Sequence, residues 1–320
     1  MLMKRFGVAL AVLCFIFGAA AQSYIRHYAI PFRAAAGIYG CFVCLLALVL
    51  VPAMQKGREI RNFVLLPLWC VPYLIYAAGT GDFHWMALAR LVAIAAAVFL
   101  VYRLAPVRQI ERFSWQDLAV AIVLIAAVLL HGLSGIWNRP LNLDFMGRLF
   151  LISVGAWCWT YVRVVPDLGY RFGISRKVLG AAALNFGYFA VIAIPCGFAL
   201  GFTAWNPRWR GISAFCLDYL EIFLFIALLE ELFFRGFLQT LISNSLKSVW
   251  IGQALVSVMF GLFHILHAPF PNWRYVVLAS IAGWFYGSAF RQAGNSLMAA
   301  ALTHAMVDTV WRTWLTRAAT

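Results

Sequence analysis

Long apolar stretches separated by short polar segments run through the whole chain. At about 20 residues per bilayer crossing, stretches of sufficient length begin near Phe6, Ala34, Phe63, Met86, Leu118, Leu149, Val178, Ser213, Val249, Tyr275 and Asn295. The segments between them are short and hold mostly single basic residues. This pattern predicts an all-α protein, a polytopic transmembrane helix bundle with about eleven spans.

Composition supports a membrane protein and argues against a nucleic-acid-binding one. Of the 320 residues, 64% are hydrophobic and 11% are charged, whereas a soluble domain is roughly half apolar and a quarter charged. The formal net charge is +14, but the basic residues are scattered instead of forming a patch or stripe. We therefore expect the lipid bilayer, and no nucleic acid, as a partner. The predicted location is the bacterial inner (plasma) membrane, as a multi-pass protein.

The basic residues give only a weak signal for orientation. With the N-terminus in the cytoplasm, fourteen Lys and Arg fall in the predicted inside loops and nine in the outside loops. The first stretch, from Lys4-Arg5 to Ala19-Ala20-Ala21, has the parts of a secretory signal peptide. Because ten further spans follow, we expect an uncleaved first helix.

Ionisable residues divide the chain near residue 200. Residues 1–200 form a multi-span region of unknown role, in which Arg90, Asp117 and His131 are interpreted as interfacial or structural. An irregular connection rich in Gly, Pro and Asn is predicted at 201–211. In residues 201–320, acids and histidines move into the apolar helices. Since a charge at membrane depth normally faces a cavity or a partner, we predict the functional core there.

Two adjacent glutamates and an arginine lie inside one apolar helix. Glu231 and Arg235 are four residues apart, with the acid first, which is the favourable order for an ion pair on a helix. Glu230 is rotated away from that pair and can face another helix. Glu230 is therefore our candidate general base.

Histidines and an aspartate on two later helices complete the candidate site. His264 and His267 lie near the end of one span, which Pro269 stops, so His264 is expected to lie deeper than His267. His304 and Asp308 are four apart in the last span, where Asp308 can accept a hydrogen bond from His304 and fix its tautomer. Glu230, His264 and His304 could converge on one water molecule, the arrangement of a hydrolase.

Other chemistries have less support in the sequence. There is no Gly-x-Ser-x-Gly elbow, no His-Glu-x-x-His motif and no Gly-rich phosphate loop. The seven cysteines lie in or beside apolar segments, and the Cys41/Cys44 pair has no histidine or second pair beside it. We expect no cofactor. Zinc stays an alternative, because Glu230, His264 and His304 would supply three ligands and leave one open position.

Three ordered motifs resemble those of the CPBP family, the CAAX proteases and bacteriocin-processing (Abi) enzymes. They are EExxxR at Glu230, Glu231 and Arg235, FxxxH at Phe260 and His264, and HxxxN/D at His304 and Asp308. The resemblance implies a glutamate-type intramembrane endopeptidase in which Glu230 and His264 activate a water. His304 and Asp308 would bind or stabilise the oxyanion. Where many relatives have asparagine, this chain has Asp308, which donates only when protonated and is therefore expected to orient His304.

The predicted function is hydrolysis of a peptide bond in a membrane-embedded or membrane-docked protein or peptide. By the resemblance, relatives cleave prenylated C-termini, process peptides or confer bacteriocin immunity, so the substrate stays open. One alternative is a non-catalytic membrane scaffold or immunity protein, and another is a zinc-dependent membrane protease. A transporter or proton relay would also place acids and histidines in a membrane, but the sequence has no evident inverted repeat.

Overall fold

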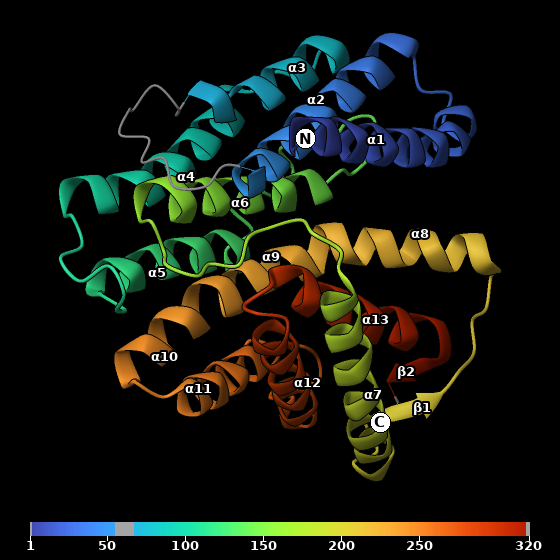
Figure 1. The fold of residues 1–320 in the computed structure, drawn as a ribbon. Coiled ribbons are helices and arrows are strands. Elements are labelled where there is room, and N and C mark those ends of the chain that lie inside the picture. Colours follow the sequence, from blue (N-terminus) through green and yellow to red (C-terminus); the bar gives the residue numbers. More distant parts are fainter. Residues whose placement is uncertain (1, 55–66, 318–320) are drawn as a thin grey trace. The chain divides into compact units, whose positions relative to one another are not determined.

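The computed structural model describes residues 2–54 and 67–317 (Figure 1). Two compact units are present, Met1–Ile110 with Ser114–Val164, and Glu111–Phe113 with Val165–Thr320. Continuous helices follow ten of the eleven predicted starts. The span expected near Phe63 begins outside the described residues, as does the loop holding Lys56, Arg58 and Arg61, and the helix after it is described from Val71. The all-α membrane bundle is confirmed.

Six helices of the described residues are long and apolar enough to cross a membrane. They cover Leu10–His27, Phe32–Ala53, Trp85–Leu104, Phe145–Val162, Arg176–Ala199 and Ile212–Leu246. Two shorter apolar helices cover Trp115–Leu129 and Val249–Leu262. Long apolar helices fit a bilayer because every backbone polar group in them is satisfied within the segment.

The first unit is entirely helical in its described part. Its elements are α1 (Leu2–His27), α2 (Phe32–Leu50), η1 (Val51–Met54), α3 (Val71–Thr80), α4 (Trp85–Leu104), α5 (Trp115–Leu129), α6 (Phe145–Trp157) and the π-helical turn η3 (Cys158–Val162). Helices α2 and α3 approach closely at Gly37 and Gly79, where a Cβ on Gly37 would lie 2.6 Å from the Gly79 Cα. Small residues at such a crossing let two membrane helices pack backbone to backbone.

A buried ion pair joins α5 to the end of η3 in this unit. Arg163 donates from Nε to Asp117 Oδ1 at 2.7 Å, and Tyr102 donates to the same oxygen at 2.8 Å. Asp117 also caps α5, where its second oxygen accepts from the Ser114 backbone N–H at 2.8 Å. Arg163 lies directly after η3, in the connection to α7, yet its side chain is fully buried against this acid. Asp117 is structural, as interpreted from the sequence.

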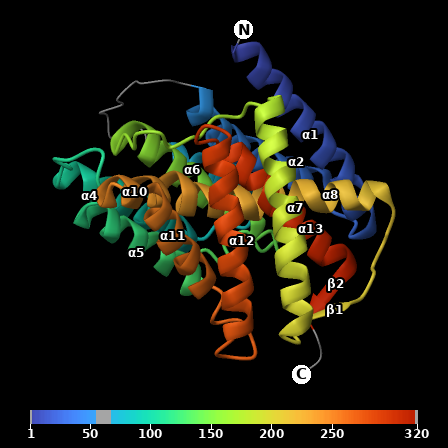
Figure 2. The same ribbon diagram turned by 60° about the horizontal axis from the view of Figure 1, so that its bottom comes forward.

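The second unit consists of helices and one short ribbon. Its elements are α7 (Arg176–Ala199), β1 (Thr203–Trp205), α8 (Ile212–Ile222), η4 (Phe223–Ala227), α9 (Leu228–Glu231), η5 (Leu232–Gln239), α10 (Thr240–Leu246), α11 (Val249–Leu262), α12 (Trp273–Gln292), α13 (Leu297–Trp314) and β2 (Leu315–Arg317). Helix α12 packs against α7, α11 and α13 (Figures 1 and 2). Packing therefore groups α7 with the later helices, and the functional division at residue 200 stays a prediction.

The ribbon is the one departure from an all-helical second unit within the described residues. Strand β1 lies in the connection that was predicted to be irregular, and it pairs antiparallel with β2, with Thr203 opposite Arg317. Two further backbone bonds extend the pairing, from Asn206 N–H to the Trp314 carbonyl and from Arg208 N–H to the Thr313 carbonyl. The ribbon fixes the end of α13 to the segment that follows α7.

Candidate active site

The two glutamates lie in a helix interrupted by π-helical turns on both sides. Residues Ile212–Leu246 form one continuous helix, in which α9 is a four-residue α-helical segment between the π segments η4 and η5. A π turn carries an extra residue, so it shifts the faces on which later side chains lie, and such turns are frequent at functional sites. Glu230 and Glu231 are thus placed by a local irregularity that a uniform helical period does not describe.

Glu231 and Arg235 form the ion pair that their spacing predicts. Arg235 Nε lies 3.1 Å from Glu231 Oε2, and both side chains are fully buried. Arg235 also donates from Nη2 to the Gly283 carbonyl at 2.9 Å, and its guanidinium lies 4.7 Å from the centre of the Phe260 ring. A buried charge of this kind needs its partner. The pair therefore anchors α9 and η5 against α11 and α12.

His304 connects this buried pair to two more exposed acids. Its Nδ1 lies 2.8 Å from Glu231 Oε1, while its Nε2 lies 3.5 Å from Asp308 Oδ2 and 3.9 Å from Glu230 Oε2. The Glu230 and Asp308 side chains are 33% and 38% exposed, whereas that of Glu231 is 0% exposed. Since an ionised carboxylate only accepts hydrogen bonds, Nδ1 carries the proton that it donates to Glu231. Nε2 then faces the accessible side.

Glu231 is the closer partner of His304, at Nδ1, whereas the sequence had pointed to Asp308 as the residue that fixes the tautomer. Asp308 is one helical turn away on α13 and reaches Nε2 only at 3.5 Å. Glu231 comes from another helix and meets Nδ1 at ordinary hydrogen-bond distance. The close partner of His304 could not be identified from spacing along one helix, because it lies 73 residues away.

The Phe260 ring contacts residues of all three motifs. This side chain is 2% exposed. The Phe260 ring centre lies 5.8 Å from that of His304 and 5.0 Å from that of His264, and the Arg235 guanidinium lies over the ring. The site residues expected from the three motifs are thus brought together. Convergence of Glu230, His264 and His304 on one water stays a prediction.

His264 and His267 lie in the segment that follows α11. His264 is partly buried and donates from Nδ1 to the Phe260 carbonyl at 2.9 Å, whereas His267 is exposed, so His264 is the deeper of the two as expected. The pKa of His267 is lowered by partial burial and by its proximity to His264 and Arg317. His267 therefore remains neutral near pH 7.

Two tyrosines on α12 support the two histidines, and sequence reasoning missed both. The Tyr286 ring is stacked on His304, with ring centres 4.5 Å apart and an interplanar angle of 13°. Tyr275 packs edge-on against His264, with centres 4.5 Å apart. The two tyrosines are eleven residues apart, about three full helical turns, and so lie on one face of α12. Two tyrosines at this spacing in an apolar helix were the sequence feature that could have indicated their role.

The side chains are not arranged as a metal site. Within residues 2–54 and 67–317, no three His, Cys, Asp or Glu side chains are grouped so that they could hold a metal ion. Zinc at Glu230, His264 and His304 would require these side chains to rearrange, and His304 could contribute only Nε2 while Nδ1 is bonded to Glu231. Zinc stays an alternative that chelation tests.

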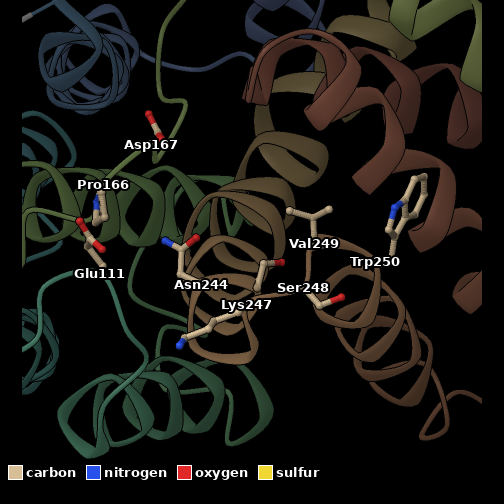
Figure 3. A pocket seen from close by; sticks show the side chains of 9 residues that line it. Glu111, Pro166, Asp167, Asn244, Lys247, Ser248, Val249 and Trp250 are labelled. Carbon is tan, nitrogen blue, oxygen red and sulfur yellow. The ribbon is translucent and has the colours of Figure 1, made fainter.

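A cavity of about 640 Å³ lies elsewhere in the second unit (Figure 3). Its lining residues are Glu111, Pro166, Asp167, Ser243, Asn244, Lys247, Ser248, Val249 and Trp250. In Figure 3 the charged side chains Glu111, Asp167 and Lys247 point in different directions and do not converge. The cavity borders the start of α11, whereas His264 follows its end, about 20 Å away at 1.5 Å per residue. It is separate from the candidate active site.

Comparison with known families supports the motif assignment. Residues 212–310 match the model of the family described as type II CAAX prenyl endopeptidase Rce1-like. The chain is similar to this family over that segment. All three motifs lie in this Rce1-like segment, so the resemblance to CAAX proteases is confirmed. No curated protein and no solved structure matches the chain.

The match and the apolar helices together indicate an integral membrane protein with a segment similar to CAAX-type proteases. The Rce1-like segment covers less than half of the chain, and residues before 212 lie outside the match.

Proposed function

We propose that the Rce1-like segment is an intramembrane endopeptidase that hydrolyses a peptide bond of a membrane-embedded or membrane-docked polypeptide. The observation that carries this proposal is the set of contacts around His304. One ring nitrogen is bonded to the buried Glu231, and the other faces the accessible carboxylates of Glu230 and Asp308. An accessible acid beside an oriented imidazole is the arrangement that general acid–base catalysis requires.

Glu230 acts as the general base in this mechanism. Its carboxylate accepts a proton from a water molecule, and the water oxygen forms a bond to the scissile carbonyl carbon while the carbonyl π electrons move to oxygen. The tetrahedral intermediate collapses when the C–O double bond re-forms and the C–N bond breaks. Protonated Glu230 then returns its proton to the leaving amine.

His264 assists Glu230 in holding the water. Its Nδ1 donates to the Phe260 carbonyl, so in the neutral ring Nε2 is left as an acceptor for one hydrogen of the water. Glu230 accepts the other hydrogen. Phe260 and Tyr275 pack on the His264 ring and limit its rotation.

His304 stabilises the oxyanion. In its protonated form the ring keeps Nδ1–H on Glu231 and donates from Nε2 toward the developing negative charge. The carboxylates of Glu231, Asp308 and Glu230, all within 3.9 Å, balance the charge of the imidazolium. Asp308 orients Nε2 rather than donating to the oxyanion itself.

Cleavage of candidate membrane substrates by the purified full-length chain tests this function. We expect Glu230→Gln to lower kcat/KM by at least about 100-fold, because a general base contributes that much or more. Glu221→Gln is the matched control, since Glu221 lies on α8 of the same continuous helix and its exposed side chain pairs with Arg312. The control should retain full activity and fold.

A strong chelator separates the metal-free mechanism from the zinc alternative. Activity that is lost in Glu230→Gln and kept with chelator supports a glutamate protease, and loss under both conditions supports zinc. Full activity of Glu230→Gln would refute the mechanism. An inactive wild type across the substrates tested would favour the scaffold or immunity alternative.

A further inference from the structure

The walls of the cavity in Figure 3 are formed by three segments of the second unit that are fixed by its packing. The first is Glu111–Phe113, where the Phe113 N–H donates to Ser245 Oγ of α10 at 2.9 Å. The second is the connection before α7, where the Leu168 carbonyl would lie 2.9 Å from a Cβ on Gly236 of η5. The third is the corner between α10 and α11. The cavity is therefore part of the packed fold.

This cavity holds charges of both signs at separate places. Glu111 and Asp167 lie on the walls formed by the two connections, and Lys247 lies at the corner between α10 and α11 (Figure 3). All three residues are exposed, and within the part of the chain that the structure describes none of them forms an ion pair. Opposite charges that are held apart are complementary to a ligand that itself carries one charge of each sign.

Two of these charged residues have a backbone conformation that glycine adopts more easily. Lys247 follows the last residue of α10 with a φ of 52°, a position at which glycine is the usual residue. Asp167 has the same φ of 52°. A strained backbone conformation at a charged residue supports a function for the side chain, because glycine there would remove the strain.

An exposed apolar stripe on α11 begins beside the cavity. Its residues follow Trp250, an exposed residue of the cavity wall, at spacings of four, three and four, and so lie on one face of the helix. They are Ile251, Leu255, Val258 and Leu262. At 1.5 Å per residue the stripe is about 16 Å long, close to half of the roughly 30 Å hydrocarbon thickness of a bilayer. The stripe thus matches an acyl chain in one leaflet, with the cavity at its headgroup end.

We propose that the cavity binds the headgroup of a zwitterionic phospholipid with a primary ammonium, of the phosphatidylethanolamine type, while an acyl chain of the same lipid lies along the apolar stripe. The carboxylates of Glu111 and Asp167 accept hydrogen bonds from the ammonium, and Lys247 pairs with the phosphate. A headgroup without an ammonium would leave both carboxylates without a cation, and a quaternary ammonium has no N–H to donate. This inference does not depend on the proposed endopeptidase function, because the cavity is separate from the candidate active site.

The test measures binding of defined lipids to the delipidated full-length protein in detergent by native mass spectrometry. Three lipids share one pair of acyl chains and carry an ethanolamine, a choline or a glycerol headgroup. We expect the ethanolamine lipid to bind with a Kd about tenfold or more lower than the other two, the size of effect that charge-assisted hydrogen bonds supply. Soluble glycerophosphoethanolamine, which has the headgroup without acyl chains, should not bind at the same concentrations.

Variants of the charged residues should change the lipid preference as well as the affinity. Lys247→Gln should raise the Kd of the ethanolamine lipid about tenfold. Lys177→Gln is the matched control, because Lys177 is exposed near the start of α7, and it should bind lipids as wild type does. In Glu111→Gln/Asp167→Asn the remaining lysine should favour the anionic glycerol lipid over the ethanolamine lipid. A protein that has lost its fold cannot produce such a reversal.

The possible outcomes separate the lipid site from its alternatives. Equal Kd values for the three lipids in wild type overturn the proposal, and so does an unchanged preference in Glu111→Gln/Asp167→Asn. A Kd that Lys247→Gln leaves unchanged would place the ethanolamine lipid elsewhere on the protein. Binding of glycerophosphoethanolamine as tight as that of the lipid would assign the cavity to a soluble zwitterion and overturn the role of the apolar stripe.

Discussion

Two buried ion pairs, one in each unit, use the same chemistry for different purposes. The pair Asp117–Arg163 is closed, because Tyr102, Ser114 and the Ile110 carbonyl complete its hydrogen bonds. The pair Glu231–Arg235 is open, because the second oxygen of Glu231 bonds to His304, whose other nitrogen faces accessible acids. A buried ion pair thus only holds helices together when all its hydrogen-bond partners are buried as well. It can support a reactive site when one of those partners, here His304, also faces an accessible group.

The two ion pairs also differ in whether their buried polar atoms all have hydrogen-bond partners. Among the described residues, Arg235 Nη1 is buried without a hydrogen-bond partner, whereas no polar side-chain atom of Asp117 or Arg163 is left so. Native proteins satisfy nearly all buried polar groups, and exceptions need a reason. Incomplete satisfaction at Arg235 is consistent with a site in which polar groups are arranged for a reaction and not only for stability.

The largest expected effect comes from breaking the open pair without changing its shape. Glu231→Gln should lower kcat by about 10²–10⁴-fold, because the amide no longer fixes His304 as a carboxylate does. Steady-state cleavage by the full-length protein measures this. Asp117→Asn is the counterpart in the closed pair, and its kcat per folded molecule should equal that of wild type. A comparable loss of kcat in both variants would remove the distinction between the pairs.

Loss of either arginine should lower the free energy of unfolding. Apolar replacement of the whole pair should restore stability at both sites but should leave cleavage activity intact only at Asp117–Arg163. Arg163→Met and Arg235→Met should each lower the free energy of unfolding by about 3–5 kcal/mol, since each leaves a buried carboxylate without its partner. Denaturation of the purified protein, followed by circular dichroism, measures the loss.

Double variants sharpen this second prediction. Asp117→Leu/Arg163→Met should regain most of the stability, because an apolar replacement of a buried pair is often neutral, and it should stay active. Glu231→Leu/Arg235→Met should regain stability and remain inactive. Recovery of cleavage in the second double variant would show that Glu231 has no role beyond packing.

A smaller effect is expected at the aromatic support of His304. Tyr286→Leu should lower kcat by about three- to tenfold, the value of a stacked aromatic contact, while Tyr286→Phe should stay close to wild type. Both variants are compared in cleavage assays with KM measured separately. A large loss in Tyr286→Phe would instead assign a chemical role to the phenol oxygen.

The smallest effect is expected at Asp308. Asp308→Asn should change kcat/KM by less than about tenfold, or about 1.4 kcal/mol, because asparagine can also bond to Nε2 and its amide can donate. A cleavage assay at several pH values checks this. Loss of activity as complete as in Glu230→Gln would make Asp308 a principal catalytic group.

Local features of the site could be predicted from the sequence, and long-range ones could not. The Glu231–Arg235 pair follows from a spacing of four on one helix. The Glu231–His304 hydrogen bond links residues 73 positions apart on different helices, and the hydrophobic periodicity of the sequence does not predict it. Asp117 could be assigned to a structural role because Ser114-x-x-Asp117 is a capping box, but its partner Arg163 was hidden by its position between two spans.

The positions of the helices were predicted well because hydrophobicity and length set them directly. About eleven spans were expected, and six of the described helices are long and apolar enough to cross a membrane. The ribbon was missed because three-residue strands depend on a partner over a hundred residues away, and the segment Thr203–Trp205 lies among turn residues. The π turns around Glu230 and Glu231 were also missed, since a hydrophobic pattern fixes a helix but not a single extra residue in its winding.

The ribbon has a consequence for exchange of this region between proteins. Paired strands lie about 4.8 Å apart, so the chain enters the region at β1 and leaves it at β2 at nearly the same point. Four continuous helices lie between these strands, so the ribbon brings together the two points at which this stretch of chain begins and ends. We therefore expect that the stretch could be exchanged at two junctions that lie next to each other in space.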